Sequence, residues 1–170
     1  MTRRAQLDRV DQSLTRIIRI VGSRASDRLR AERSGVDLPR PALSVLAALY
    51  RTGPSRLSDL GAATHLEPAL VGRSTRALEA DGLLTVARDP DDRRSTIATL
   101  TAAGRRAFER HRQAADDVLD DTLRGWTPDD LALLADVLDR LAADFARRAR
   151  TGDHLARTTD HLARTTDRVT

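Results

Sequence analysis

A short segment of the chain combines two arginines with a helical pattern. In residues 68–81 the apolar side chains repeat at helical spacing, and Arg73 and Arg76 fall on the opposite face, beside the small residues Ala69 and Gly72. Arginine is the side chain that most often binds guanine through paired hydrogen bonds in the DNA major groove. Small neighbours would let such a helix approach the groove closely. An ordinary solvent-exposed helix face is the simpler interpretation.

A second pair of arginines lies in the polar run 89–94, between two segments of alternating apolar and polar side chains. The alternation predicts a β-hairpin with this run at its tip. Asp92 is close enough in sequence to orient the guanidinium of Arg94, and Arg93 adds a further positive charge. An oriented arginine on a narrow projection suits the DNA minor groove. A charged surface turn is the alternative.

Side chains suited to catalysis or metal binding are sparse. The chain has no cysteine, and its four histidines are neither grouped with other metal ligands nor placed beside a nucleophile. The sequence also lacks a glycine-rich phosphate-binding loop. We therefore expect no enzymatic activity, no catalytic residues, no cofactor and no metal site.

The pattern around the first arginine pair predicts a helix-turn-helix. Residues 42–50 repeat apolar side chains at helical spacing, and residues 55–64 follow as a short helix with Ser55 as its expected N-cap. After a turn, the helix over 68–81 starts at a proline and stops before Gly82. A short helix, a turn and a longer helix are the outline of this motif.

Long apolar stripes flank this predicted head. The stripe from Leu7 to Leu29 predicts one helix of about seven turns, and two more helices are expected, from 102 to about 125 and from 128 to about 147–150. A small head cannot cover all of these stripes, so we expect a second copy of the chain to cover them. The predicted fold class is mainly α with a small β-hairpin wing, in which a winged helix-turn-helix head joins a helical dimerisation region. The predicted boundaries are a single domain at 1–150, with the head at 38–101 and dimerisation helices at 1–34 and 102–150.

The C-terminal tail, residues 151–170, contains a repeated heptad, because residues 153–159 recur unchanged at 160–166. One leucine and one alanine per heptad make a thin apolar seam, and the paired threonines lower the helix propensity. We expect a flexible tail. A helical extension is the alternative.

Composition and charge restrict the partners without identifying them. The 170 residues carry a net charge of +4, and all 29 basic residues are arginine. Residues 1–40 contain ten arginines against five acidic residues, whereas residues 113–150 contain more acids than arginines. A basic front half is compatible with a polyanion such as DNA. The sequence shows no membrane span and no secretion signal, so we expect a soluble, cytoplasmic protein without a membrane partner.

Taken together, several of these stretches resemble the MarR family of winged helix-turn-helix regulators. The resemblance covers about residues 7–148. Its most specific part is the run Asp89-Pro90-Asp91-Asp92-Arg93-Arg94, followed six residues after Arg94 by Leu100-Thr101. The other matching stretches are residues 57–61, 68–73, 78–84 and 100–105.

The resemblance implies a homodimer that binds a pseudo-palindromic operator in double-stranded DNA. Members of the family are commonly repressors that a small aromatic or acidic ligand releases. Carried onto this chain, it assigns Arg73 and Arg76 to the major groove and Arg94, oriented by Asp92, to the minor groove. Glu67 departs from the family, which usually has Ser or Thr at the start of the recognition helix. The DNA contacts predicted in this way are Ser55, Arg56, Ala69, Gly72, Arg73, Arg76, Asp92, Arg93 and Arg94.

If an effector binds, its site is expected between the dimerisation helices and the head, lined from the first, second and fifth predicted helices. Ordinary core packing is the alternative for the candidate residues. A different function also remains open, in which the winged helix contacts another protein and binds no specific DNA. The candidate ligand residues are Leu14, Ile17, Ile18, Leu46, Tyr50 and His111.

Overall fold

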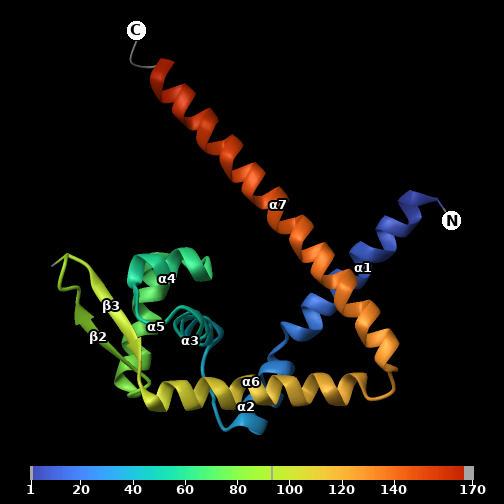
Figure 1. Ribbon diagram of the computed structural model, residues 1–170, viewed down its shortest axis with the longest axis horizontal. Helices are drawn as coiled ribbons and strands as arrows, with labels where there is room; N and C mark the ends of the chain where they lie inside the picture. Colours follow the sequence, from blue (N-terminus) through green and yellow to red (C-terminus); the bar gives the residue numbers. More distant parts are fainter. Residues whose placement is uncertain (1, 93, 167–170) are drawn as a thin grey trace. The chain divides into compact units, whose positions relative to one another are not determined.

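The computed structural model describes residues 2–92 and 94–166, and it consists mainly of helices with one small sheet (Figure 1). The chain divides into two compact units, Met1–Asp121 and Thr122–Thr170. The predicted fold class, mainly α with a small wing, is confirmed. The elements are α1 (Arg3–Val21), α2 (Arg24–Ser34), α3 (Arg40–Thr52), β1 (Ser55–Arg56), α4 (Leu57–Thr64), α5 (Pro68–Ala80), β2 (Leu84–Arg88), β3 (Thr96–Leu100), α6 (Ala102–Leu123) and α7 (Pro128–Thr166).

A core of aliphatic side chains holds the helix-turn-helix together in the first unit. α3 packs against both α4 and α5, and the sheet lies beside these helices (Figure 1). Gly53 follows α3 and Gly82 follows α5, both with positive φ, which glycine adopts without strain. The predicted helix-turn-helix is therefore confirmed. The core consists of Ala42, Val45, Leu46, Ala48, Leu49, Leu60, Val71, Leu78, Leu84 and Ala98.

Three antiparallel strands, in the order β1-β3-β2, form the wing. β2 and β3 make the predicted hairpin. The short strand β1 was not predicted, and in it Ser55 pairs with Ala98 of β3. The prediction that Ser55 is the N-cap of the following helix is therefore wrong. Pairing with β3 keeps its backbone extended, and α4 begins only at Leu57.

The start of α6 is fastened to the base of the hairpin. The hydroxyl of Thr101 accepts a hydrogen bond from the Gly104 N–H (3.0 Å) and donates one to the Gly82 carbonyl (2.8 Å). Gly104 lies so close to the turn that precedes β2 that a Cβ at this position would be 1.8 Å from the carbonyl oxygen of Leu83. Only glycine fits here without a shift of the backbone.

The long N-terminal helix expected from the apolar stripe is broken in two. α1 ends at Val21, and α2 begins at Arg24. Gly22 closes α1, and the hydroxyl of Ser23 accepts a hydrogen bond from the Ser26 N–H (3.2 Å) as the N-cap of α2. The prediction of one continuous helix is wrong because this glycine-serine pair ends one helix and starts another.

The second unit is dominated by α7. At its start the Thr127 hydroxyl accepts a hydrogen bond from the Asp130 N–H (3.2 Å), and the Asp130 carboxylate accepts one from the Thr127 N–H (3.2 Å). α7 continues to Thr166, beyond the end predicted near residues 147–150. The heptad copies at 153–166 contain neither proline nor glycine, so no residue there stops the helix. Residues 167–170 lie outside the described part of the chain.

Replacing Gly104 by alanine should destabilise the first unit, because the added Cβ would overlap the Leu83 carbonyl and force α6 away from it. We expect a loss of about 1–3 kcal/mol in the free energy of unfolding, measured by urea denaturation. Gly61→Ala in α4 is the matched control, because a Cβ there would lie 3.6 Å from its nearest neighbour, an ordinary contact. Equal stability of the two variants would contradict the close approach at Gly104.

Candidate nucleic-acid interface

The two faces of α5 differ sharply. Val71 and Leu78 are 1% and 0% exposed and point into the core, whereas Arg73 and Arg76 are exposed on the other side. Neither guanidinium forms a hydrogen bond or ion pair with a described residue. Ala69 beside them is also exposed. The predicted separation of an apolar face from an arginine face is confirmed, and it leaves two free, adjacent cations on one helix.

The N-terminus of α5 carries no side-chain cap. Glu67 occupies the N-cap position, but its carboxylate accepts no hydrogen bond from the helix, and Pro68 follows as the first helical residue. The turn before it depends on His65, whose φ of 54° is left-handed. His65 thus lies in the turn between α4 and α5.

Asp92 shapes the tip of the wing through backbone and hydroxyl contacts. Its carboxylate accepts hydrogen bonds from the Arg94 N–H (3.0 Å) and the Ser95 hydroxyl (2.7 Å), and these bonds lower the pKa of Asp92, the Ser95 bond most. The expected pairing of Asp92 with the Arg94 guanidinium is wrong, since the carboxylate is engaged by the loop itself. The Arg94 side chain is exposed, without a polar partner among the described residues. Arg93 lies outside the described residues.

An ion pair that local sequence reasoning missed anchors the wing to β1. Asp89, at the end of β2, is 3% exposed, and its carboxylate accepts a hydrogen bond from Nε of Arg56 (2.6 Å). It also accepts one from the Asp91 N–H (2.9 Å). The Asp91 bond is the largest cause of the lowered pKa of Asp89, and burial opposes this lowering. No local pattern could reveal the pair, because the two partners are 33 residues apart.

Ser55 and Arg56, two residues predicted to contact DNA, instead have polar partners within the head. Ser55 is half-buried, and its hydroxyl donates to the Gly53 carbonyl (3.0 Å) and lies 2.9 Å from the Thr52 hydroxyl. Arg56 is held by Asp89. Among the predicted contacts with charged side chains, the structure thus leaves Arg73, Arg76 and Arg94 free and commits Arg56 and Asp92 to positioning the wing.

The six candidate ligand residues do not meet at one place within the chain. Leu46 is 0% exposed in the core, whereas Ile17 and Ile18 of α1 are 55% and 69% exposed. The hydroxyl of the half-buried Tyr50 donates to Glu109 (3.3 Å). Leu14 is half-buried on α1. Within one chain these residues are thus spread over separate surroundings, and a ligand site shared by them stays a prediction, because helical spacing shows which side chains share a face but not which faces meet.

One of the pockets formed by the described residues is lined mainly by α2 and the segment after it, and His111 is the member of the six that lies in it. This pocket has a volume of about 620 Å³. Nδ1 of His111 is buried and has no hydrogen-bond partner among the described residues, and burial, with the nearby Arg30, lowers the pKa of its imidazole. His111 is therefore mainly neutral at neutral pH. The lining residues are Arg24, Asp27, Arg28, Ala31, Glu32, Gly35, Val36, Asp37, Leu38, Leu43 and His111.

The described residues contain no group of three or more acidic or histidine side chains placed to hold a metal ion. No helix in this part of the chain is long and apolar enough to cross a membrane.

The Arg56–Asp89 pair gives a pH-dependent prediction. The pKa of Asp89 is lower in the folded chain than its ordinary value of 3.8, so its charge stabilises the fold above about pH 4 and this contribution is lost as the pH falls through the lowered pKa. Asp89→Asn should therefore lower the urea midpoint clearly at pH 7 and less at pH 3. Asp91→Asn, in the same loop, is the control and should show no such gap. An equal effect of Asp89→Asn at both pH values would contradict the role of its charge.

The comparisons with known proteins agree with this geometry. A family model described as MarR family matches residues 38–96, which hold α3 to α5 and part of the wing. YdgJ, an uncharacterized HTH-type transcriptional regulator of Bacillus subtilis (strain 168), is 30% identical over 99 residues, which are 58% of this chain and 60% of YdgJ. The matched region thus spans less than two thirds of that relative.

Solved structures share the fold over more of the chain. A probable transcriptional regulator from Pseudomonas aeruginosa superimposes with a TM-score of 0.61 at 27% identity, covering 78% of this chain and 98% of that one. Bordetella bronchiseptica BpsR, whose DNA binding is regulated by 6-hydroxynicotinic acid, gives a TM-score of 0.52 at 27% identity, covering 81% and 96%. Residues 38–96 are thus similar to the MarR family, and the chain shares the fold of these solved transcriptional regulators.

Proposed function

We propose that this protein is a homodimeric transcriptional repressor that binds a pseudo-palindromic operator in double-stranded DNA through α5 and the wing. The observation that carries the proposal is the exposed face of α5. Arg73 and Arg76 stand there without polar partners among the described residues, and their opposite face is fixed in the core. Free guanidinium groups on a rigid helix match the acceptors of guanine in the major groove. Such a regulator would act in the cytoplasm, beside the DNA.

The wing supplies the second contact in this proposal. Its tip carries the exposed Arg94, while Asp92 and the Arg56–Asp89 pair hold the loop below it. A single arginine on a braced projection suits the narrow minor groove, where groove width and negative potential are sensed more than base identity.

Dimer formation is supported by the apolar side chains that α1 leaves exposed. α1 has no buried residue, and its exposed apolar side chains lie at helical spacing on a segment rich in arginine. Apolar surface of this extent marks an interaction site. A second copy of the chain is the partner that a two-fold symmetric operator would require. These side chains are Leu7, Val10, Ile17, Ile18, Ile20 and Val21.

The two sets of arginines are expected to contribute differently to DNA binding. Arg73→Ala and Arg76→Ala should each cost about 1–3 kcal/mol on the preferred duplex and relax discrimination at one base pair, because base-edge hydrogen bonds are lost. Arg94→Ala should weaken binding with little change in base preference outside A·T-rich flanks. Fluorescence anisotropy on duplexes selected by the wild-type protein from a random-sequence pool measures both effects.

Arg112→Ala on α6 is the control for this series, since it removes one exposed positive charge outside the proposed interface. It should change affinity little. If Arg94→Ala left affinity intact while the two α5 variants abolished binding, the wing would be a polar turn only. If none of the three differed from Arg112→Ala, the proposed interface would be wrong.

We also propose that a small aromatic or acidic ligand releases the protein from DNA. The pocket of about 620 Å³ beside His111 supports this idea, as does BpsR, whose DNA binding responds to 6-hydroxynicotinic acid. A set of aromatic acids that includes this compound should contain one that raises the melting temperature and weakens duplex binding. The same compound should have a smaller effect on His111→Ala. If no compound changed either property, a ligand-independent regulator would be indicated.

A further inference from the structure

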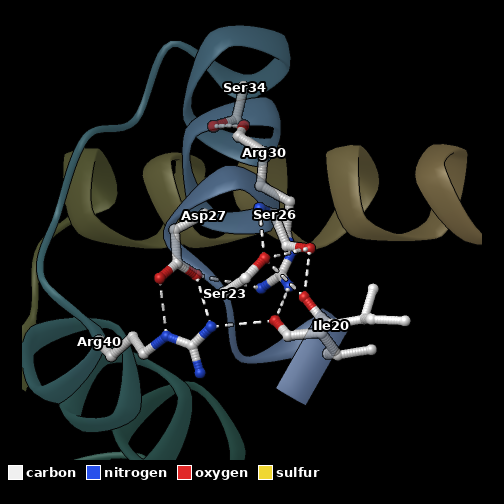
Figure 2. Close-up of polar contacts among 8 residues, drawn as sticks. Ile20, Ser23, Ser26, Asp27, Arg30, Ser34 and Arg40 are labelled. Carbon is white, nitrogen blue, oxygen red and sulfur yellow. Dashed lines mark hydrogen bonds and ion pairs between the residues drawn. The ribbon is translucent and has the colours of Figure 1, made fainter. Parts of the chain in front are cut away.

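The junction between α1 and α2 is built from polar contacts to the last carbonyl groups of α1 (Figure 2). The Ile20 carbonyl accepts hydrogen bonds from the hydroxyls of Ser23 and Ser26, both at 2.7 Å. The Val21 carbonyl accepts one from Nη2 of Arg30 (2.8 Å). The last carbonyls of a helix have no partner within the helix. Here α2 supplies the missing donors, and so fixes the end of α1.

A residue of the DNA-binding head joins the same junction. Arg40 is the first residue of α3, and its Nη2 donates to the Val21 carbonyl (3.0 Å). The same guanidinium binds the Asp27 carboxylate of α2 through two parallel hydrogen bonds of 2.8 Å, from Nε and from Nη2. Figure 2 shows Arg40 reaching from α3 to Asp27 of α2. One planar guanidinium thus ties the end of α1 and the first turn of α2 to the start of α3.

Apolar packing does little to fix α1 against the rest of the first unit. No residue of α1 is buried, and Ile17, Ile18 and Ile20, in its last turns, are all more than half exposed. The hydrogen bond from Arg40 lowers the pKa of Asp27, so the pair stays charged at neutral pH. The direction in which α1 leaves the head therefore depends mainly on the polar junction.

We infer that Asp27 and Arg40 are positioning residues that select the spacing between the two DNA half-sites. The inference rests on the proposed function, in which α1 contributes to the dimer and α5 contacts DNA. In such a dimer the two heads are related through α1, so its direction sets the distance and rotation between the two recognition helices. Adding one base pair between half-sites separates them by about 3.4 Å and rotates one by roughly 35°. A rigid junction rejects this change, and a loosened one tolerates it.

The test uses Arg40→Gln, which cannot form the two-bond contact, and Asp27→Asn, which leaves Arg40 in place. Arg112→Gln is the control, because Arg112 pairs along α6, with Asp116 at 3.6 Å, and is 59% exposed. Full-length proteins are titrated on the duplex selected by wild type and on versions with the spacer changed by one and two base pairs. Urea denaturation checks that each variant is folded.

A second readout does not depend on DNA. The chain has no cysteine, so Arg51→Cys on the exposed end of α3 places a single spin label on each head. Double electron-electron resonance then measures the distance between the two spin labels, one on each head of a dimer. The distance distribution should be narrow in wild type and in Arg112→Gln, and broad in Arg40→Gln and Asp27→Asn.

In both junction variants, the preference for the selected spacing over the altered ones should fall roughly fivefold, the low end of typical coupling between sites. An unchanged spacing preference and an unchanged distance distribution in folded Arg40→Gln and Asp27→Asn would overturn the inference while leaving the proposed function intact. A wild-type protein that shows no dipolar signal and binds no duplex would overturn both the proposed function and the inference.

Discussion

The burial of one face of α5 is the constraint on which the rest of the head depends. Val71 and Leu78 are almost inaccessible to solvent and contribute to the same core as Leu46 and Leu49 of α3. Rotating α5 about its axis would expose these side chains and bury charge, both at a high cost in free energy. The helix therefore has one stable orientation, and its arginines face solvent in every folded molecule. The exposed arginine face is thus a consequence of the packing of the opposite side of α5.

Contacts between segments distant in sequence stabilise the wing, whose hairpin is only weakly indicated by the local sequence. A hairpin alone is only marginally stable in water. Here β1 adds a third strand, the Arg56–Asp89 pair ties the end of β2 to that strand, and Gly104 lets α6 approach the turn before β2. Each contact joins segments that are far apart in the chain. The position of the wing relative to α5 is thus a property of the whole head.

Much of the head was predictable because its signals are local. Proline and glycine mark the limits of α5, and alternation marks the two hairpin strands. The errors have a common physical origin in partners distant in sequence. Serine is a common N-cap, but Ser55 pairs with Ala98 and therefore lies in a strand. Asp89 has the sequence context of a turn residue, and only the folded chain shows its hydrogen bond with Arg56. The break at Gly22 was missed because the apolar stripe continues across it, although glycine followed by serine is a stop and start signal.

Sedimentation of the full-length protein, with and without a fluorescent duplex selected from a random pool, shows directly whether a dimer binds duplex DNA through its heads. We expect a dimer at micromolar concentration, two chains on each duplex, and affinity that falls steeply between about 50 and 200 mM salt as phosphate contacts are screened. A monomer that leaves the duplex unbound at about 50 mM salt would rule out this DNA-binding dimer and favour a winged helix that contacts protein.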